Sequence, residues 1–206
     1  SIQAALAVER INAAMTATAG NGQAAARELA FIREESERLG LVYNDTALAY
    51  AKFSASTKNT TVEGEATRKI FIGVSEAVTA MKLSGEESNG IFLALSQMMS
   101  KGKISAEELS GQLGERLPGA IKLTADAMGL TTAELLKQMQ EGQLMSSDVL
   151  PKLAEQLHTT YGAAAVEAAK GGQAEINRFN NALFDTKAAL GTALMPTFTS
   201  LLNNVI

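Results

Sequence analysis

The chain has 206 residues, of which 46% are hydrophobic and 5% aromatic, with no Trp and no Cys. This length can bury a hydrophobic core in one domain or two small ones, and the apolar fraction is too high for a disordered chain. The formal net charge of −4 argues against a protein that binds duplex DNA through a clustered basic face, and the lack of Cys excludes disulfides and thiolate metal sites.

Apolar residues recur with the period of an α-helix along almost the whole chain. In the first half, the pattern predicts helices over residues 2–19, 23–39, 46–57, 61–82 and 85–99. No sustained alternation of apolar and polar residues indicates a strand. The predicted fold class is therefore all-α, a compact bundle of short helices followed by a long C-terminal amphipathic helix.

Several helix starts match the capping box, in which a Ser or Thr is followed three residues later by Glu. The matching pairs are Thr60 with Glu63, Ser84 with Glu87, Ser105 with Glu108, and Thr131 with Glu134. The starts are unevenly spaced, which argues against a solenoid repeat. They predict a run of short, separately delimited helices.

The stretch "SGQLGERLPGAI" at residues 110–121 places glycines and a proline inside a helical region. Proline pushes the preceding residue out of the helical conformation, so Pro118 should end the helix that starts at Ser105. Gly119 should then turn the chain into a further helix that closes on Gly129.

Gly111 and Gly114 lie three positions apart, which places them on one face of the same predicted helix. Two internal glycines cost a helix about 2 kcal/mol, so some contact should offset the loss. We expect a flat face against which a neighbouring helix packs closely. The alternative is that both glycines are exposed and merely tolerated.

A long amphipathic helix is predicted from residue 175 to the end of the chain, with a kink expected near Pro196. Its apolar stripe predicts an interaction surface and consists of Ile176, Phe179, Leu183, Leu190, Leu194, Phe198, Leu201 and Val205. The stripe could be a core face of this domain, or a seam for an oligomer or coiled coil. A membrane span is disfavoured by Pro196 and by the neighbouring Asn, Thr and Ser residues. We divide the chain into a helical module, 1–170, and this helix, 171–206.

The sequence offers little enzyme chemistry. His158 is the sole histidine, which argues against a Ser-His-Asp triad and excludes any two-histidine metal site. We expect His158 near a helix end, where a positive charge interacts favourably with the helix dipole. Glu107, Glu108 and Glu115 are acid–base candidates only as any Glu would be. The chain is predicted not to be an enzyme and to use no cofactor or metal.

Residues 94–144 resemble the N-terminal tape-measure domain of long-tailed bacteriophages and prophages. The similarity is carried by "LSQM", "SKGKISAEEL", "GQLGERLPGA" and "AMGLTTAEL", and weaker similarity extends over roughly residues 25–190. The residues of this chain that match the family motif are Ser105, Glu108, Gly111, Gly114, Pro118, Gly119, Gly129, Thr131 and Glu134.

The resemblance implies a phage tail assembly protein. Tape measure proteins are long helical chains that set tail length, because tube subunits polymerise around several copies. The implied locations are the tail-tube lumen of the virion and, during assembly, the host bacterial cytoplasm. The implied partners are tail-tube and other tail assembly proteins and further tape-measure copies, and a homo-oligomer is one expected outcome. The net charge predicts no specific nucleic acid partner, and the composition of the last helix disfavours membrane contact.

An α-helix rises about 1.5 Å per residue, so an efficient ruler needs long continuous helices. This chain interrupts its helices every 10 to 20 residues. We therefore expect a compact module at one end of the ruler, which serves as an anchor or assembly hub. The competing hypotheses are a helical adaptor outside phage tails, such as a secretion-system component, and a cell-wall hydrolase domain. Neighbouring tail genes would favour the tail assignment.

Overall fold

The computed structural model describes the backbone of residues 1–205 and the side chains of residues 1–203. Within this part of the chain every regular element is a helix, and a single isolated bridge joins Lys103 to Met145. The all-α prediction is confirmed. The elements are α1 (Ile2–Ala19), α2 (Gly22–Leu39), α3 (Tyr43–Thr57), α4 (Glu65–Ala80), α5 (Gly85–Lys101), η1 (Glu107–Leu113), α6 (Ala120–Met128), α7 (Thr132–Gln140), α8 (Ser146–Ala168) and α9 (Gly172–Val205).

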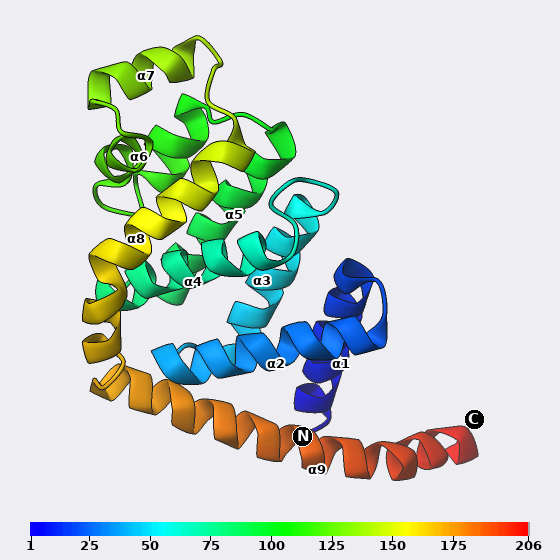
Figure 1. The fold of residues 1–206 in the computed structure, drawn as a ribbon. Helices are drawn as coiled ribbons and strands as arrows, with labels where there is room; N and C mark the ends of the chain where they lie inside the picture. Colours follow the sequence, from blue (N-terminus) through cyan, green and yellow to red (C-terminus); the bar gives the residue numbers. More distant parts are fainter. Residues whose placement is uncertain (206) are drawn as a thin grey trace.

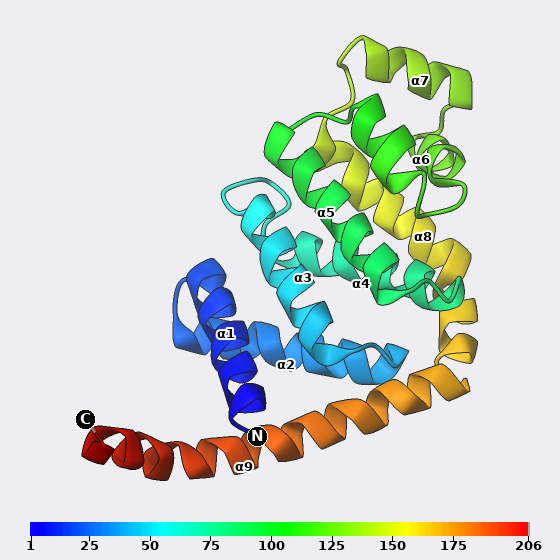
Figure 2. The same cartoon turned by 180° about the vertical axis from the view of Figure 1, so that it is seen from behind.

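The helices from α1 to α8 form a body, and α9 runs along one edge of it (Figure 1). Helices α3, α4, α5 and α8 lie together, with α6 and α7 at the far end from α9 (Figures 1 and 2). The first half of α9 lies beside α1 and α2, and its second half extends past the body. The division of the chain at residue 170 stays a prediction.

The core centres on the contact between α4 and α8, the most extensive in the molecule. On the side of α4 that faces α2, α3 and α5, aromatic rings fill the space between the helices. The ring of Phe71 lies 5.2 Å from that of Tyr50, 5.9 Å from that of Phe31 and 5.4 Å from that of Phe92, measured between centroids. These separations are typical of favourable aromatic pairs.

Two of the predicted capping boxes are confirmed. At α5, the amide of Glu87 donates to the Ser84 hydroxyl at 3.2 Å, and the Ser84 amide donates to the Glu87 carboxylate at 2.7 Å. Thr131 and Glu134 make the same reciprocal pair at the start of α7, with distances of 3.2 and 2.8 Å. Each box satisfies two backbone donors that the helix leaves free.

The capping box predicted at Thr60 is wrong. The Glu63 carboxylate instead accepts the amide of Asn59 at 2.7 Å, which closes a turn before the helix. Asn59 and Gly64 both have positive φ, 60° and 85°, so a helix cannot run through either of them. Helix α4 therefore begins at Glu65.

Helix α9 is continuous through Pro196, so the proline does not end it. A proline removes one backbone donor and leaves the carbonyl four residues earlier without its helical partner. Here the overhanging half of α9 is exposed on almost all sides, and that carbonyl can bond to water.

Candidate functional site

The family-motif segment lies between α5 and α7 and surrounds a buried carboxylate. The Glu108 side chain is fully buried; Lys101 donates to one of its oxygens, and the Ser105 hydroxyl donates to the other. The predicted capping box at Ser105 is therefore wrong, because the two side chains bond to each other and no side chain caps η1. Burial raises the pKa of Glu108, but the hydrogen bonds from Lys101 and Ser105 outweigh burial and lower it.

The predicted turn at Gly119 is confirmed, but the helical segment ends at Leu113, so the prediction that Pro118 ends it is wrong. Pro118 lies in the connection between η1 and α6, and Gly119 adopts φ 78° directly before α6. Gly129 ends α6 with φ 67°. Both glycines take the left-handed conformation that other residues adopt at a cost.

The close helix contact expected at Gly111 and Gly114 is wrong. A Cβ on Gly111 would meet nothing nearer than a carbonyl oxygen at 4.0 Å. A Cβ on Gly114 would lie 2.5 Å from the carbonyl oxygen of Ser110, within its own segment. The segment is a wide π-type turn in which the amide of Gly114 reaches back to the carbonyl of Leu109 at 2.9 Å, so Gly114 relieves crowding inside the turn.

Other glycines make the close contacts between helices. A Cβ on Gly73 of α4 would lie 2.3 Å from the carbonyl oxygen of Ala154 on α8. On α9, a Cβ on Gly191 would lie 2.1 Å from the carbonyl oxygen of Ser1. Neither glycine stands out in the sequence, because each belongs to an otherwise ordinary helical pattern.

Helix α9 docks on the body through small and polar side chains. The Asn181 amide group donates to the Leu41 carbonyl at 2.8 Å and accepts the Tyr43 amide at 3.0 Å. Asn177 donates to the Gly40 carbonyl at 2.8 Å. These bonds satisfy polar groups of the connection between α2 and α3, and they fix both the rotation and the register of α9.

The docked face continues along the helix with small residues. Ala174, Ala188 and Gly191 are buried against the body. An ion pair between Arg33 and Asp185 adds a contact at 3.1 Å, although both side chains are at least 40% exposed and the pair contributes little. Hydrogen bonds and close backbone approach hold α9, with little burial of large apolar groups.

The predicted apolar stripe faces solvent. Its exposed fractions run from 40% for Leu183 to 68% for Phe179. The members whose side chains the structure describes are all exposed: Ile176, Phe179, Leu183, Leu190, Leu194, Phe198 and Leu201. The side chain of Val205 lies outside the described part. The alternative that this stripe is a core face of the domain is wrong, because residues on another face of α9 make the contact with the body.

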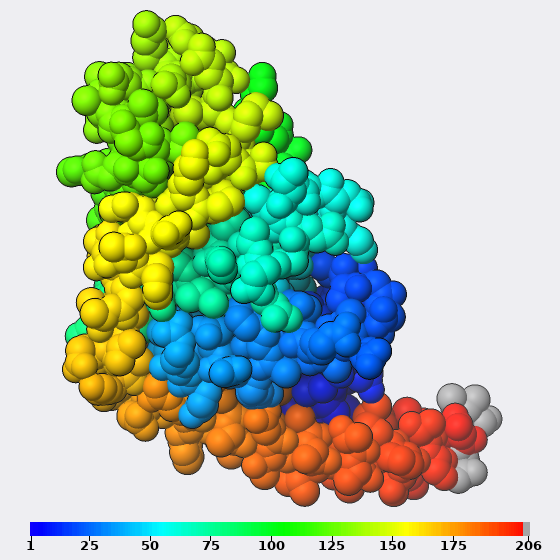
Figure 3. Space-filling view, in the orientation of Figure 1, coloured from blue at the N-terminus to red at the C-terminus, as the bar shows by residue number. Residues whose placement is uncertain are grey.

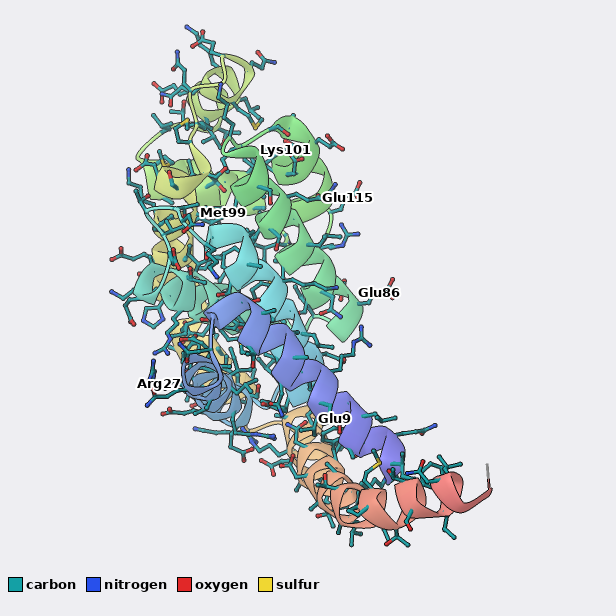
Figure 4. All side chains as sticks on the ribbon, turned by 90° about the vertical axis from the view of Figure 1, so that its right-hand side faces the viewer. Glu9, Arg27, Glu86, Met99, Lys101 and Glu115 are labelled. Carbon is teal, nitrogen blue, oxygen red and sulfur yellow. The ribbon has the colours of Figure 1, made fainter. Side chains whose placement is uncertain are left out.

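Two findings on the described residues concern other kinds of site. No helix among them is long and apolar enough to cross a membrane. No group of three or more His, Asp or Glu side chains in the described region could hold a metal ion. Charged side chains such as Glu86 and Glu115 project outward from the body (Figure 4).

Comparison with known proteins decides the family. A family model described as "Tape measure protein" matches residues 1–192. The chain belongs to the tape measure protein family. Over 191 residues this tape measure chain is 34% identical to a probable tape measure protein of Salmonella phage Felix O1 (isolate Felix O1-VT1), and the match covers 93% of the chain and 25% of that relative. No solved structure matches it.

The tape measure chain thus spans about a quarter of the relative's length. Family membership makes it part of a structural phage tail protein. The membership was visible in the motif of residues 94–144, and the structure assigns that motif to the far end of the body from α9.

A cluster around the buried carboxylate of Glu76 in this tape measure chain was missed by sequence reasoning. Glu76 of α4 is 2% exposed, and Arg38 of α2 donates to it at 3.0 Å. Nδ1 of His158 lies 2.5 Å from the other Glu76 oxygen. His158 is in the middle of α8, so its expected place near a helix end is wrong. The cluster joins three helices, and its only sequence signal was a charged residue inside the apolar pattern of α4.

Proposed function

We propose that this segment is the anchor and assembly hub of a tail length tape measure protein, which scaffolds tail-tube polymerisation while extended parts of the protein set tail length. The observation that carries the proposal is that α1 to α8 fold back on one another. The longest helix within this body, α8, has 23 residues and spans roughly 35 Å. As a single helix, 170 residues would span roughly 255 Å. A compact body of this kind is better suited to attach to other tail proteins than to set the length of the tail.

The proposed partners are proteins: tail-tube and other tail assembly proteins, and further tape-measure copies. The exposed stripe of α9 supports protein contact, because exposed apolar rows of this size mark interaction surfaces. The net charge of −4 supports the absence of specific nucleic-acid binding, since neutralisation of phosphates supplies most non-specific affinity for DNA. We place the protein in the tail-tube lumen of the virion and, during assembly, in the host bacterial cytoplasm.

Two insertions of equal length, one in the body and one in α9, test whether the body acts as an anchor or as part of the ruler. A flexible 36-residue segment inserted between Gly20 and Asn21, both exposed between α1 and α2, lengthens the chain inside the body. A helical segment of the same length inserted between Ser200 and Leu201 lengthens α9 by roughly 54 Å. Tail lengths would be measured by electron microscopy of phage carrying each variant.

An anchor predicts wild-type tails from the first insertion and longer tails from the second. Circular dichroism of both purified variants controls for folding. Tails that lengthen equally in both cases would show that the body is measured as part of the ruler, and would refute the proposal.

A further inference from the structure

Helices α3 and α5 enclose a groove on the surface of the body. The two helices run side by side in the same direction (Figures 2 and 4). Residues near the start of both helices line a hollow of about 340 Å³, and later residues line a second hollow of about 490 Å³. Lys52 of α3 and Leu93 of α5 line both, so the two hollows form one groove. A smaller hollow of about 90 Å³ adjoins the first, because Asp45 and Asn89 line both of these.

The groove has the side chains that admit another helix. How closely two helices pack depends on the size of the side chains between them. Leu93 stands out from the groove with 55% of its surface exposed, which leaves an apolar contact open. Helix α9 lies along another edge of the body and projects past it, so it leaves the groove accessible (Figure 3). The small residues that line the groove are Ala49, Ala55, Ser56, Ser96 and Ser100.

The smallest hollow contains a buried hydroxyl group without a partner. Ser75 is 2% exposed, and its Oγ has no hydrogen-bond partner among the described residues. Such a group is unfavourable when it stays unpaired. The hollow has apolar walls, which include Val42 and Leu83, and room for the end of a lysine side chain. An ammonium group donates up to three hydrogen bonds, so it can bond to the Ser75 hydroxyl and to the carboxylate of Asp45 at this hollow.

Two charged residues of α3 give the groove an acidic end and a basic middle. Asp45 and Lys52 are seven residues apart, which places them on one face of the helix and about 10 Å apart along it. Neither makes an ion pair with any residue that the structure describes. Both are exposed or line the groove, so both charges are open to a partner of opposite charge.

We propose that this groove binds one amphipathic α-helix of another tail protein, an inference that rests on the proposed hub role of the body. The bound helix carries an acidic residue against Lys52 and an aliphatic residue against Leu93 three or four positions later. Seven positions after the acidic residue it carries a lysine, which enters the hollow beside Asp45 and Ser75. These three positions share one face of a helix.

The order of the charges sets the direction of the bound helix. Asp45 lies in the first turn of α3, and Lys52 lies two turns later. A helix antiparallel to α3 therefore places its acidic residue nearer its own N-terminus and its lysine nearer its C-terminus. This is the distribution that the helix dipole favours, whereas a parallel helix would need the reverse.

Photo-crosslinking in assembling tails identifies the bound segment. Phage would encode the full-length tape measure protein with benzoylphenylalanine in place of Leu93. The matched control has it in place of Val166, an apolar residue of α8 that is 47% exposed and lies outside the groove. Mass spectrometry maps the linked segment. We expect Leu93, but not Val166, to link to one helix of a tail protein that carries the acidic, aliphatic and lysine positions in this order.

Charge reversal tests the contact at the acidic end. Asp45→Lys should lower the titre of infectious phage at least tenfold, and replacement of the partner's lysine by aspartate should restore it. Glu34→Lys, at an exposed position of α2, is the matched control and should leave the titre unchanged. Circular dichroism of the purified chains should show the same helix content for both variants, because both positions are exposed.

The variant Ser75→Ala distinguishes a lysine site from a hollow that holds water. The free chain should melt no lower than the natural chain, because the hydroxyl has no partner in it. The linked segment, synthesised as a peptide, should bind to the variant about tenfold more weakly. A lower melting temperature together with unchanged affinity would show that water alone occupies the hollow, and would refute the lysine site.

Three results would overturn the groove as a docking site: no link from Leu93 beyond that from Val166, a linked segment without the three positions, or an Asp45→Lys defect that the partner's reversal does not restore. The insertion between Gly20 and Asn21 tests the anchor role separately. Wild-type tails from that insertion would leave the anchor role standing if the groove fails. Lengthened tails would refute the anchor role even where the Leu93 link is found.

Discussion

The substitution Gly73→Ala should destabilise the protein, although alanine is the better helix former. Gly73 lies in α4 where that helix meets α8. The added Cβ would lie 2.3 Å from the carbonyl oxygen of Ala154 and 3.0 Å from its carbonyl carbon. An ordinary contact begins near 3.4 Å, so the two helices would have to separate by about 1 Å. The obstacle is backbone, which cannot rotate away as a side chain can.

Two opposing effects set the size of the loss. Replacement of glycine by alanine inside a helix stabilises by about 1 kcal/mol. Overpacking of a tight core contact costs about 3 kcal/mol, at the upper end of the usual range because the contact is with backbone. The free energy of unfolding should therefore fall by about 2 kcal/mol, and the melting temperature of a chain of this size by about 4–8 °C.

The matched control is Gly111→Ala. A Cβ there meets nothing nearer than 4.0 Å, so the entropic gain of alanine should raise stability by about 0.5–1 kcal/mol. Urea and thermal unfolding followed by circular dichroism would measure both variants. If Gly73→Ala melts at or above the natural temperature, or if Gly111→Ala melts clearly below it, the assignment of close contact to Gly73 and open space to Gly111 is refuted.

Three further outcomes are expected. The pKa of Glu108 is lowered in the folded chain, so its ionised form contributes stability that is present above its ordinary pKa of 4.5 and is lost as the pH falls through the lower folded pKa. Urea unfolding should show Glu108→Gln less stable than the natural chain at pH 7, and the difference should shrink as the pH falls below 4.5. Asn181→Ala leaves the Leu41 carbonyl and the Tyr43 amide without partners, and should cost about 1–3 kcal/mol while hydrogen exchange in α9 accelerates. A fluorescence anisotropy titration at physiological salt should find no micromolar binding to duplex DNA, and such binding would contradict the proposed protein-only partners.

The sequence by itself determined the features that depend only on residues close to one another along the chain. The starts of α5 and α7 could be predicted because each capping box forms between residues three positions apart, Ser84 with Glu87 and Thr131 with Glu134. Gly119 turns the chain before α6, because glycine adopts a positive φ without the steric cost that other residues bear. The apolar stripe of α9 could equally be predicted, since a helix of known pitch places those side chains on one face.

Only the tertiary structure decided which surfaces meet. Periodicity shows that α9 has an apolar face but not that its Ala, Asn and Gly face docks on the body, because docking depends on partners more than a hundred residues away, such as Leu41 and Tyr43. The close approach at Gly73 and the burial of Glu76 likewise depend on α8. Local pattern sets the shape of each helix, whereas the burial of a side chain depends on what the rest of the chain places against it.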